Sequence, residues 1–301
     1  MDLRETASEG GAGIVVDEAA RDAAGAGWAS RLQLRYERVG ARTVAWHRHE
    51  GATRVLAALH PEGDERCHHV LVHPPGGMAG GDTVDLEVDV RAGAHALLTT
   101  PGATRFYRSL GAGAAQRLHA RVAAGARLEW LPLESLAFEA CIAENRCVFE
   151  LEPGAELLAW DMLALGRPAA GDDFARGSFT QHLEIAGVWL ERGRIDGGDR
   201  VLREAPGGLA GAQALGTLLL AAGEALTPQR RDELLESVRE LLGDLPDGVH
   251  AGVTSPQPRL LALRATAPRI EPLAELLRAA WACLRERAWG LPACAPRVWS
   301  T

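Results

Sequence analysis

The sequence predicts a mainly β protein, built from layered strand repeats that resemble a β-superhelix and followed by two helices near the C-terminus. Three observations support this fold class. A pattern of strand, Gly-Ala corner and second strand recurs along the middle of the chain, apolar and polar residues alternate before each corner, and the last third changes to helical spacing. Each element is justified in turn below.

Three copies of the repeat turn at Gly93, Gly125 and Gly154, which lie 32 and 29 residues apart. A weaker fourth copy turns at Gly187. A period of this length is typical of stacked units, each burying its apolar face against the next. An ordinary antiparallel meander of similar hairpins is the alternative left open.

The residues before the first corner show why we expect strands. Leu86, Val88 and Val90 share one face of an extended segment, whereas the residues between them are charged. Period-two alternation of this kind indicates a half-buried strand. Glycine at the corner permits a left-handed or bulged turn.

Helical signals begin at Thr227, which can cap a helix that starts at Pro228. The spacing of leucines predicts helices over about 228–243, closed by Gly243, and over about 272–289. Strands are expected between the helices, at 249–254 and 259–266. We treat 25–301 as a single domain and residues 1–24 as an acidic, flexible leader.

Composition excludes several classes of protein. The chain has 32 basic residues and all are arginine, so a P-loop ATPase or GTPase and a Schiff-base enzyme, which need a lysine, are excluded. A net charge of −8 argues against sequence-independent nucleic-acid binding. No apolar run is long enough to span a bilayer and no signal peptide is apparent, so we expect a cytoplasmic protein with five reduced cysteines.

A histidine-rich strand leads into a glycine-rich loop, His73–Asp82. The loop lacks the spacing of a phosphate-binding motif and precedes a strand, so we expect a tight turn, with a partner-docking loop as the alternative. Cys67, His69 and His73 share one strand face and are weak candidates for metal ligands. The strand spreads them over roughly 13 Å, so structural roles are the default expectation.

Local signatures of a catalytic nucleophile are absent from the sequence. The remaining candidates for chemistry are carboxylates beside apolar residues, Glu129, Glu134, Glu139 and Asp161, which we expect to face solvent. Any that points inward needs an arginine, a water or a metal, because an unpaired buried carboxylate is costly. A binding scaffold is therefore favoured over an enzyme, with a metal-dependent hydrolase using Cys67, His69 and His73 as the competing hypothesis.

Four segments, His73–Asp82, Thr99–Ser109, Leu128–Glu134 and Leu165–Phe174, resemble in this order the signatures of the UreD (UreH) family of urease accessory proteins. The resemblance extends from about Trp28 to Trp299. On this resemblance the family-motif residues are His73, Gly76, Gly77, Gly80, Gly81, Asp82, Arg105, Tyr107, Arg167 and Gly171. Leu133 and Asp172 depart from the family pattern, which usually has Gln and Glu there.

The resemblance implies a non-catalytic chaperone with a β-superhelical fold. It implies partners, namely the helical protein UreF, the GTPase UreG and the urease apoprotein, and a role in inserting nickel into urease. No tightly bound cofactor is expected, only transient Ni²⁺ passing along an internal route, for which Glu129 and Glu134 are the lining candidates. A static scaffold without nickel transfer is the alternative.

Overall fold

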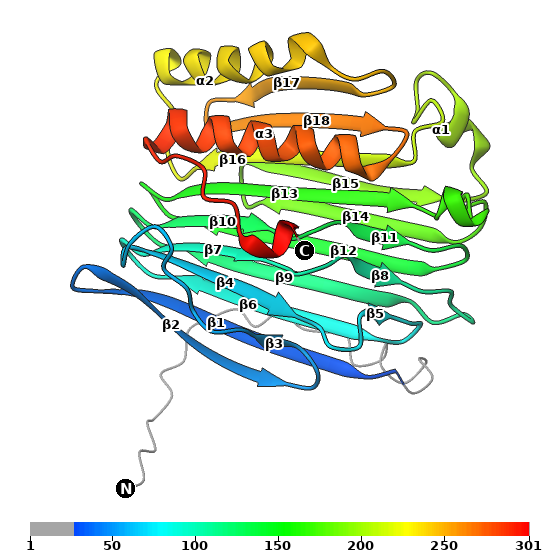
Figure 1. Ribbon diagram of the computed structural model, residues 1–301, viewed down its shortest axis with the longest axis horizontal. Helices are drawn as coiled ribbons and strands as arrows, with labels where there is room; N and C mark the ends of the chain where they lie inside the picture. Colours follow the sequence, from blue (N-terminus) through cyan, green and yellow to red (C-terminus); the bar gives the residue numbers. More distant parts are fainter. Residues whose placement is uncertain (1–26, 301) are drawn as a thin grey trace, which may run out of the picture.

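Two β-sheets packed face to face form the body of the protein (Figure 1). The computed structural model describes residues 27–300, so the leader 1–24 lies outside the described residues. In spatial order the first sheet contains β15 (Trp189–Asp196), β14 (Ser178–Ile185), β12 (Ile142–Leu151), β9 (Ala114–Val122), β6 (Thr83–Val90), β1 (Ala29–Val39) and β2 (Arg42–Glu50). All neighbours between β1 and β14 pair in parallel, so the meander alternative is wrong for this region.

The second sheet packs against one face of the first sheet. In spatial order it contains β17 (His250–Gln257), β18 (Leu260–Ala267), β16 (Ala214–Ala222), β13 (Glu156–Leu165), β10 (Arg127–Leu131), β7 (His95–Thr99), β4 (Arg66–Val72) and β3 (Arg54–Val55). Short strands β11 (Ser135–Ala137), β8 (Thr104–Phe106) and β5 (Gly77–Met78) extend it at one end. Strands β4, β7, β10 and β13 are parallel, and β16, β18 and β17 are antiparallel.

Each predicted repeat crosses from the first sheet to the second at its glycine corner. Gly93, Gly125 and Gly154 all have positive φ, at 70°, 67° and 78°. The alanine after each corner glycine is buried. The strands that follow pair in parallel, with Arg127 opposite both His95 and Glu156, so the corners stack in register. The repeat prediction is thus confirmed as a solenoid-like stack.

The weaker fourth repeat is wrong. After Gly187 the chain turns back and forms β15, which pairs antiparallel with β14, Ile185 lying opposite Trp189. The place beside β13 in the second sheet is occupied instead by β16. The hairpin therefore leaves β14 paired on its outer side by β15.

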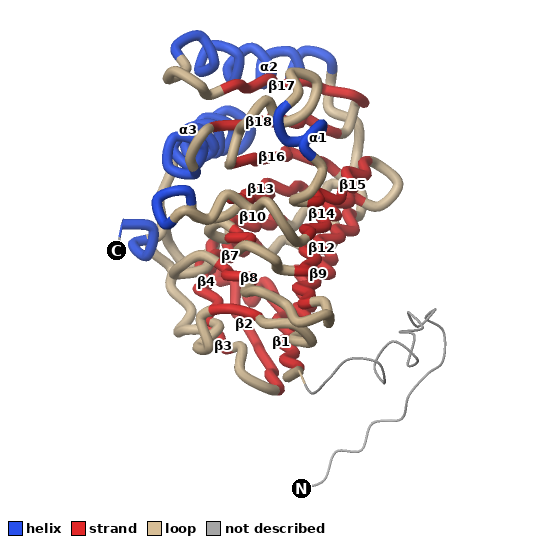
Figure 2. The backbone as a smooth tube through the Cα atoms, turned by 90° about the vertical axis from the view of Figure 1, so that its right-hand side faces the viewer, coloured by secondary structure: helices blue, strands red, loops and turns tan. Residues whose placement is uncertain are grey.

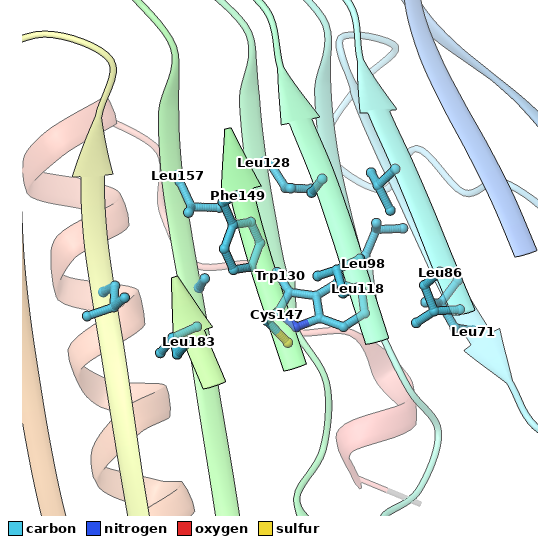
Figure 3. Packing of buried hydrophobic residues seen from close by; sticks show 14 of the residues in the cluster. Leu71, Leu86, Leu98, Leu118, Leu128, Trp130, Cys147, Phe149, Leu157 and Leu183 are labelled. Atoms are coloured by element: carbon cyan, nitrogen blue, oxygen red, sulfur yellow. The ribbon is translucent and has the colours of Figure 1, made fainter. Parts of the chain in front are cut away.

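Two apolar layers hold the architecture together. The larger layer lies between the sheets, where side chains such as Leu86, Leu118, Trp130 and Phe149 meet (Figure 3). The smaller layer lies between the second sheet and helices α2 (Pro228–Leu241) and α3 (Ile270–Trp289), on the side away from the first sheet (Figure 2).

The helix predictions are confirmed with shifted ends. Thr227 caps α2 by accepting a hydrogen bond from the Arg230 amide, and Gly290 ends α3 in the left-handed conformation. Helix α2 ends at Leu241 and continues as a 3-10 turn, so Gly243 does not close it. A short helix, α1 (Arg200–Glu204), was not predicted, and 3-10 turns lie at Pro168–Ala170, Leu242–Asp244 and Arg297–Ser300.

Replacing any corner glycine by valine is expected to destabilise the protein by about 1 to 3 kcal/mol, because a β-branched residue is strained at positive φ. Steric clash is not the cause, since a Cβ at Gly93 or Gly125 would meet no atom within 4 Å. Urea midpoints measure the effect. Gly252→Val is the matched control, because Gly252 lies in β17 with equally open space and without positive φ. Equal midpoints for corner and control variants would contradict the strain argument.

Candidate functional site

The family-motif residues gather at one end of the second sheet. Parallel strands β4, β7, β10 and β13 all finish there, and parallel strands place the loops that follow them side by side. The glycine-rich loop continues β4 and contains β5, which pairs with β8. Strand β8 in turn pairs with β11 (Figure 1).

The glycine-rich loop is a tight turn, as the sequence predicts. Gly76 and Gly81 have positive φ. A Cβ at Gly77 would lie 2.4 Å from the Tyr107 ring, and one at Gly80 would lie 2.6 Å from the Ala112 carbonyl. Asp82 fixes the loop, since its carboxylate accepts hydrogen bonds from the backbone amides of Ala79 (2.7 Å) and Trp28 (3.2 Å). Only glycine allows this approach of neighbouring segments.

The other motif residues extend this packed end. Arg105 donates to the Gly76 carbonyl at 3.4 Å, and the Tyr107 ring packs edge-on against Phe138. The Arg167 guanidinium lies over the Phe138 ring, 4.3 Å from its centroid. It also pairs with Asp172 at 3.4 Å. Gly171 ends a 3-10 turn in the left-handed conformation.

A cavity of about 210 Å³ opens beside these loops, where strands of both sheets contribute to its wall. His73 and Arg105 line it from the second-sheet side. Gln116, on β9, and Trp130, on β10, line it further in. A polar side chain, Gln116, therefore connects the cavity with the space between the sheets.

Two rows of polar residues face each other between the sheets, beyond the cavity. The row on the first sheet lies in register across three parallel strands: Gln116, Asn145 and Gln181. The row on the second sheet lies in register across three antiparallel strands: Asp161, Thr217 and Arg264. Both rows interrupt the apolar layer between the sheets.

Hydrogen bonds join the two rows at Asp161. Gln116 Nε2 donates to Asn145 Oδ1 at 3.3 Å, and Asn145 Nδ2 donates to Asp161 Oδ1 at 3.1 Å. Gln181 Nε2 donates to Asp161 Oδ2 at 3.0 Å. Farther along, Glu191 of β15 accepts from the Thr217 hydroxyl at 3.4 Å. Asp161 and Thr217 are register neighbours on β13 and β16, so a path of polar residues leads from the cavity to Glu191.

Glu191 is the outer end of the path. Its carboxylate pairs with Arg264 at 2.9 Å, and the Arg264 side chain is largely exposed. The Arg264 guanidinium also lies over the Trp189 ring, 5.6 Å from its centroid. The path therefore runs from the motif loops, between the sheets, to an exposed ion pair.

Asp161 is buried, which corrects the expectation that it faces solvent. Burial raises the pKa of Asp161 from 3.8 to about 6, the negative charge of Glu191 adds to the rise, and hydrogen bonds from Gln181 and Asn145 oppose it. The carboxyl is therefore ionised at neutral pH, and within residues 27–300 its side-chain partners are amides and not bases. An anion held only by amide donors can attract a cation.

Asp161→Asn is expected to stabilise the protein by up to about 2 to 3 kcal/mol at pH 7.5 and to change little at pH 4, since each unit of pKa shift is worth about 1.4 kcal/mol. The native pKa lies above the unfolded value, so the wild type loses stability as pH rises between about 4 and 6. Gln181 can turn its amide to accept from the new Asn. Urea melts at both pH values measure the difference, and an equal effect at pH 4 would contradict burial as the cause.

Glu129 is buried too, but on the opposite face of the second sheet, under α3. Its carboxylate lies 2.8 Å from His95 Nε2 and accepts from Trp281 Nε1 (2.7 Å) and Arg285 Nε (3.1 Å). Burial would raise the pKa of Glu129, but these hydrogen bonds and charges hold it below its usual value. As the sequence argument requires of an inward carboxylate, Glu129 has an arginine partner, and it faces away from the cavity.

Glu134 and Glu139 lie near the motif loops. Glu134 is half-buried, and its backbone carbonyl accepts from the Thr104 amide at 2.9 Å. Glu139 pairs with the exposed Arg176 at 2.7 Å. Neither side chain belongs to the two polar rows. The geometry therefore favours Asp161 and Glu191 over Glu129 and Glu134 as carboxylates along an internal path.

The histidine-rich strand has structural contacts. His69 Nδ1 lies 2.8 Å from the Tyr36 hydroxyl, and the His73 ring packs at a tilt of 35° against Trp28. Burial raises the pKa of the Cys67 thiol to about 12, which disfavours the metal-binding thiolate. Within residues 27–300 no three His, Cys, Asp or Glu side chains are grouped to hold a metal ion. The five cysteines are free, as expected.

Sequence reasoning missed the three amides, Gln116, Asn145 and Gln181. Each stands at an inward position of its strand, which is the one available signal in the sequence. Asn145 is the clearest example, because it alternates with the buried Ala143 and Cys147 of β12. A polar residue at an apolar position of a strand indicates an interior polar site when its neighbours carry one too.

The stacked parallel strands, the closely packed loop end and the polar rows between the sheets define a solenoid-like β protein with polar residues set into an apolar interior. The chain belongs to the UreD family of urease accessory proteins, whose model matches residues 29–300. Relatives named urease accessory protein UreD include that of Paracidovorax citrulli, 54% identical over 273 residues, and that of Leptothrix cholodnii, 53% identical over 276 residues. In both cases 91% of this chain and 99% of the relative are covered. None of the helices in residues 27–300 has the length and apolar character that a membrane span requires.

Proposed function

We propose that this protein is a non-catalytic chaperone of urease maturation, acting in the cytoplasm. In this proposal it works in a complex with UreF and the GTPase UreG on the urease apoprotein, and it passes Ni²⁺ to urease along the polar path between its sheets. Membership of the UreD family supports the urease role. The absence of lysine from the sequence agrees with nucleotide hydrolysis by a partner.

The buried, ionised Asp161 among amide donors carries the conduit proposal. Ni²⁺ bound by thiolates or several imidazoles would be released slowly, whereas carboxylate and amide oxygens hold it weakly. Asp161 and Glu191 can each offer such oxygens, and the amides of Asn145 and Gln181 can turn to present theirs. The path therefore suits transfer of an ion better than storage.

The test is a double variant, Asp161→Asn with Glu191→Gln, produced in a urease-expressing strain that lacks the native protein. Nickel per purified urease is expected to fall on the order of tenfold, because losing about 1.4 kcal/mol of attraction for the ion changes its occupancy tenfold. The complex with the partner proteins should remain intact, since side-chain volumes are kept. Nickel analysis and co-purification measure both.

The matched control removes two charges elsewhere. Glu87→Gln with Asp89→Asn alters the outer face of β6, where Glu87 pairs with the exposed Arg31. This control should leave the nickel content unchanged. Normal nickel content in the path variant would exclude Asp161 and Glu191 as the route and favour the static scaffold. Normal nickel content in the strain without the protein would overturn the urease role itself.

A further inference from the structure

Two exposed histidines, His47 and His49, lie on β2 at the edge of the first sheet. Residues two apart on a strand project from the same face. The two imidazoles are stacked, with centroids 6.2 Å apart and planes 14° from parallel. Neither ring has a hydrogen bond to another described residue that would hold it in place. They are free to turn toward a common ligand.

Register shows which face of the sheet these histidines occupy. His47 lies opposite Leu34 and His49 opposite Leu32, and both leucines are buried in the layer between the sheets. Ala45, on the same face of β2, packs against that layer. The two histidines therefore continue the inner face of the first sheet past the point where the second sheet ends.

A third imidazole lies behind this pair. The pKa of His69 is lowered to about 4, by burial first and then by the charges of His47 and His60. Register supports this proximity, because the hydroxyl of Tyr36 lies 2.8 Å from His69 and Tyr36 is opposite Ala45, two residues before His47. Because Tyr36 holds the Nδ1 atom of His69, the exposed pair is the part of this cluster that can rearrange around an ion.

The histidine pair also lies near the cavity. Ser30 donates to the backbone carbonyl of Glu50, the residue after His49, at 3.0 Å. The Ser30 hydroxyl also lies 2.8 Å from the Thr53 hydroxyl, and Thr53 lines the cavity. Three residues of chain thus separate the pair from the cavity wall.

We propose that His47 and His49 form a chelating site for a late first-row divalent metal ion such as Ni²⁺, with water completing the coordination. Imidazole nitrogen suits these metals, and two ligands on one strand bind as a chelate. Since only two side chains coordinate, the site is weak and its ion exchanges readily. The inference stands on the geometry of β2 and does not depend on the proposed role in urease maturation.

Equilibrium dialysis of the untagged, full-length protein against NiCl₂ tests the site. The double variant His47→Ala with His49→Ala should lose one exchangeable ion per chain. His49→Ala alone should weaken binding by at least about tenfold, because it breaks the chelate. His250→Ala is the control, since His250 is a lone exposed histidine on a strand, β17. Because all three histidines are exposed, the His47, His49 and His250 substitutions should leave the thermal midpoint of the protein unchanged.

Electron paramagnetic resonance of the protein with one equivalent of Cu²⁺ gives a second readout. The wild type should show hyperfine coupling to two imidazole nitrogens, and His49→Ala to one. Unchanged Ni²⁺ binding in the double variant, or an unchanged Cu²⁺ spectrum in His49→Ala, would overturn the proposal. Neither measurement involves urease. Failure of the proposed histidine site would therefore leave the test of the nickel path unaffected.

Discussion

Arg285→Met is expected to destabilise the protein by about 3 to 5 kcal/mol, the usual cost of removing one partner from a buried ion pair. The Arg285 side chain has no exposed surface. It donates to both carboxylate oxygens of Glu62 at 2.7 Å and to Glu129 at 3.1 Å. The substitution would leave two carboxylates of lowered pKa without their shared cation.

Urea unfolding of the variant and of Arg287→Met, an exposed arginine on the same helix, would measure this effect. The deficit should shrink as pH falls through the native pKa values of Glu62 and Glu129. Both native pKa values lie below that of an ordinary glutamate, so the wild type keeps the stabilisation above the ordinary pKa and loses it in acid. A deficit independent of pH would assign the loss to packing instead.

Trp160→Ala should cost about 3 to 5 kcal/mol, because it removes a fully buried indole from the layer under the helices. The Trp160 ring lies 5.2 Å from Trp299 and 6.5 Å from Trp281, and its Nε1 donates to the Pro132 carbonyl at 2.6 Å. The space left by the missing indole would thus loosen the packing of both α3 and the C-terminal turn.

Thermal unfolding of Trp160→Ala and Trp160→Phe separates packing from hydrogen bonding. The phenylalanine variant keeps most of the ring contacts and leaves the Pro132 carbonyl unpaired, so it should lose only about 1 to 3 kcal/mol. Limited proteolysis near Trp299 should be faster in the alanine variant. Equal losses in the two variants would mean that the hydrogen bond, and not the volume, is what matters.

The repeats could be predicted from the sequence because their signal is local. Gly125 and its flanking alternation define a corner without reference to any other segment, and the stack follows from repetition. The hairpin at Gly187 could not be predicted, since its local sequence also fits a corner. In the folded chain the place beside β13 is occupied by β16, a strand that comes later in the sequence.

The candidate site was less predictable because it depends on which faces become covered. Alternation correctly separates Glu129 from Leu128 and Trp130, yet it does not reveal that α3 lies over the carboxylate. Trp281, which donates to Glu129, is 152 residues away in the chain. The facing polar rows likewise arise from strand register across several repeats, which a single strand does not record.

The ion pair between Arg285 and Glu62 spans 223 residues, and this separation bears on the order of events during synthesis. Parallel coils about 30 residues apart can stack as soon as two of them have left the ribosome, since each buries its face on its neighbour. Glu62 and Glu129, however, stay without their arginine until α3 emerges, because Arg285 follows Glu129 by 156 residues. The nascent chain therefore carries two acids without their cation beside an otherwise finished sheet, and docking of α3 locks the stack only after all of its strands have been made.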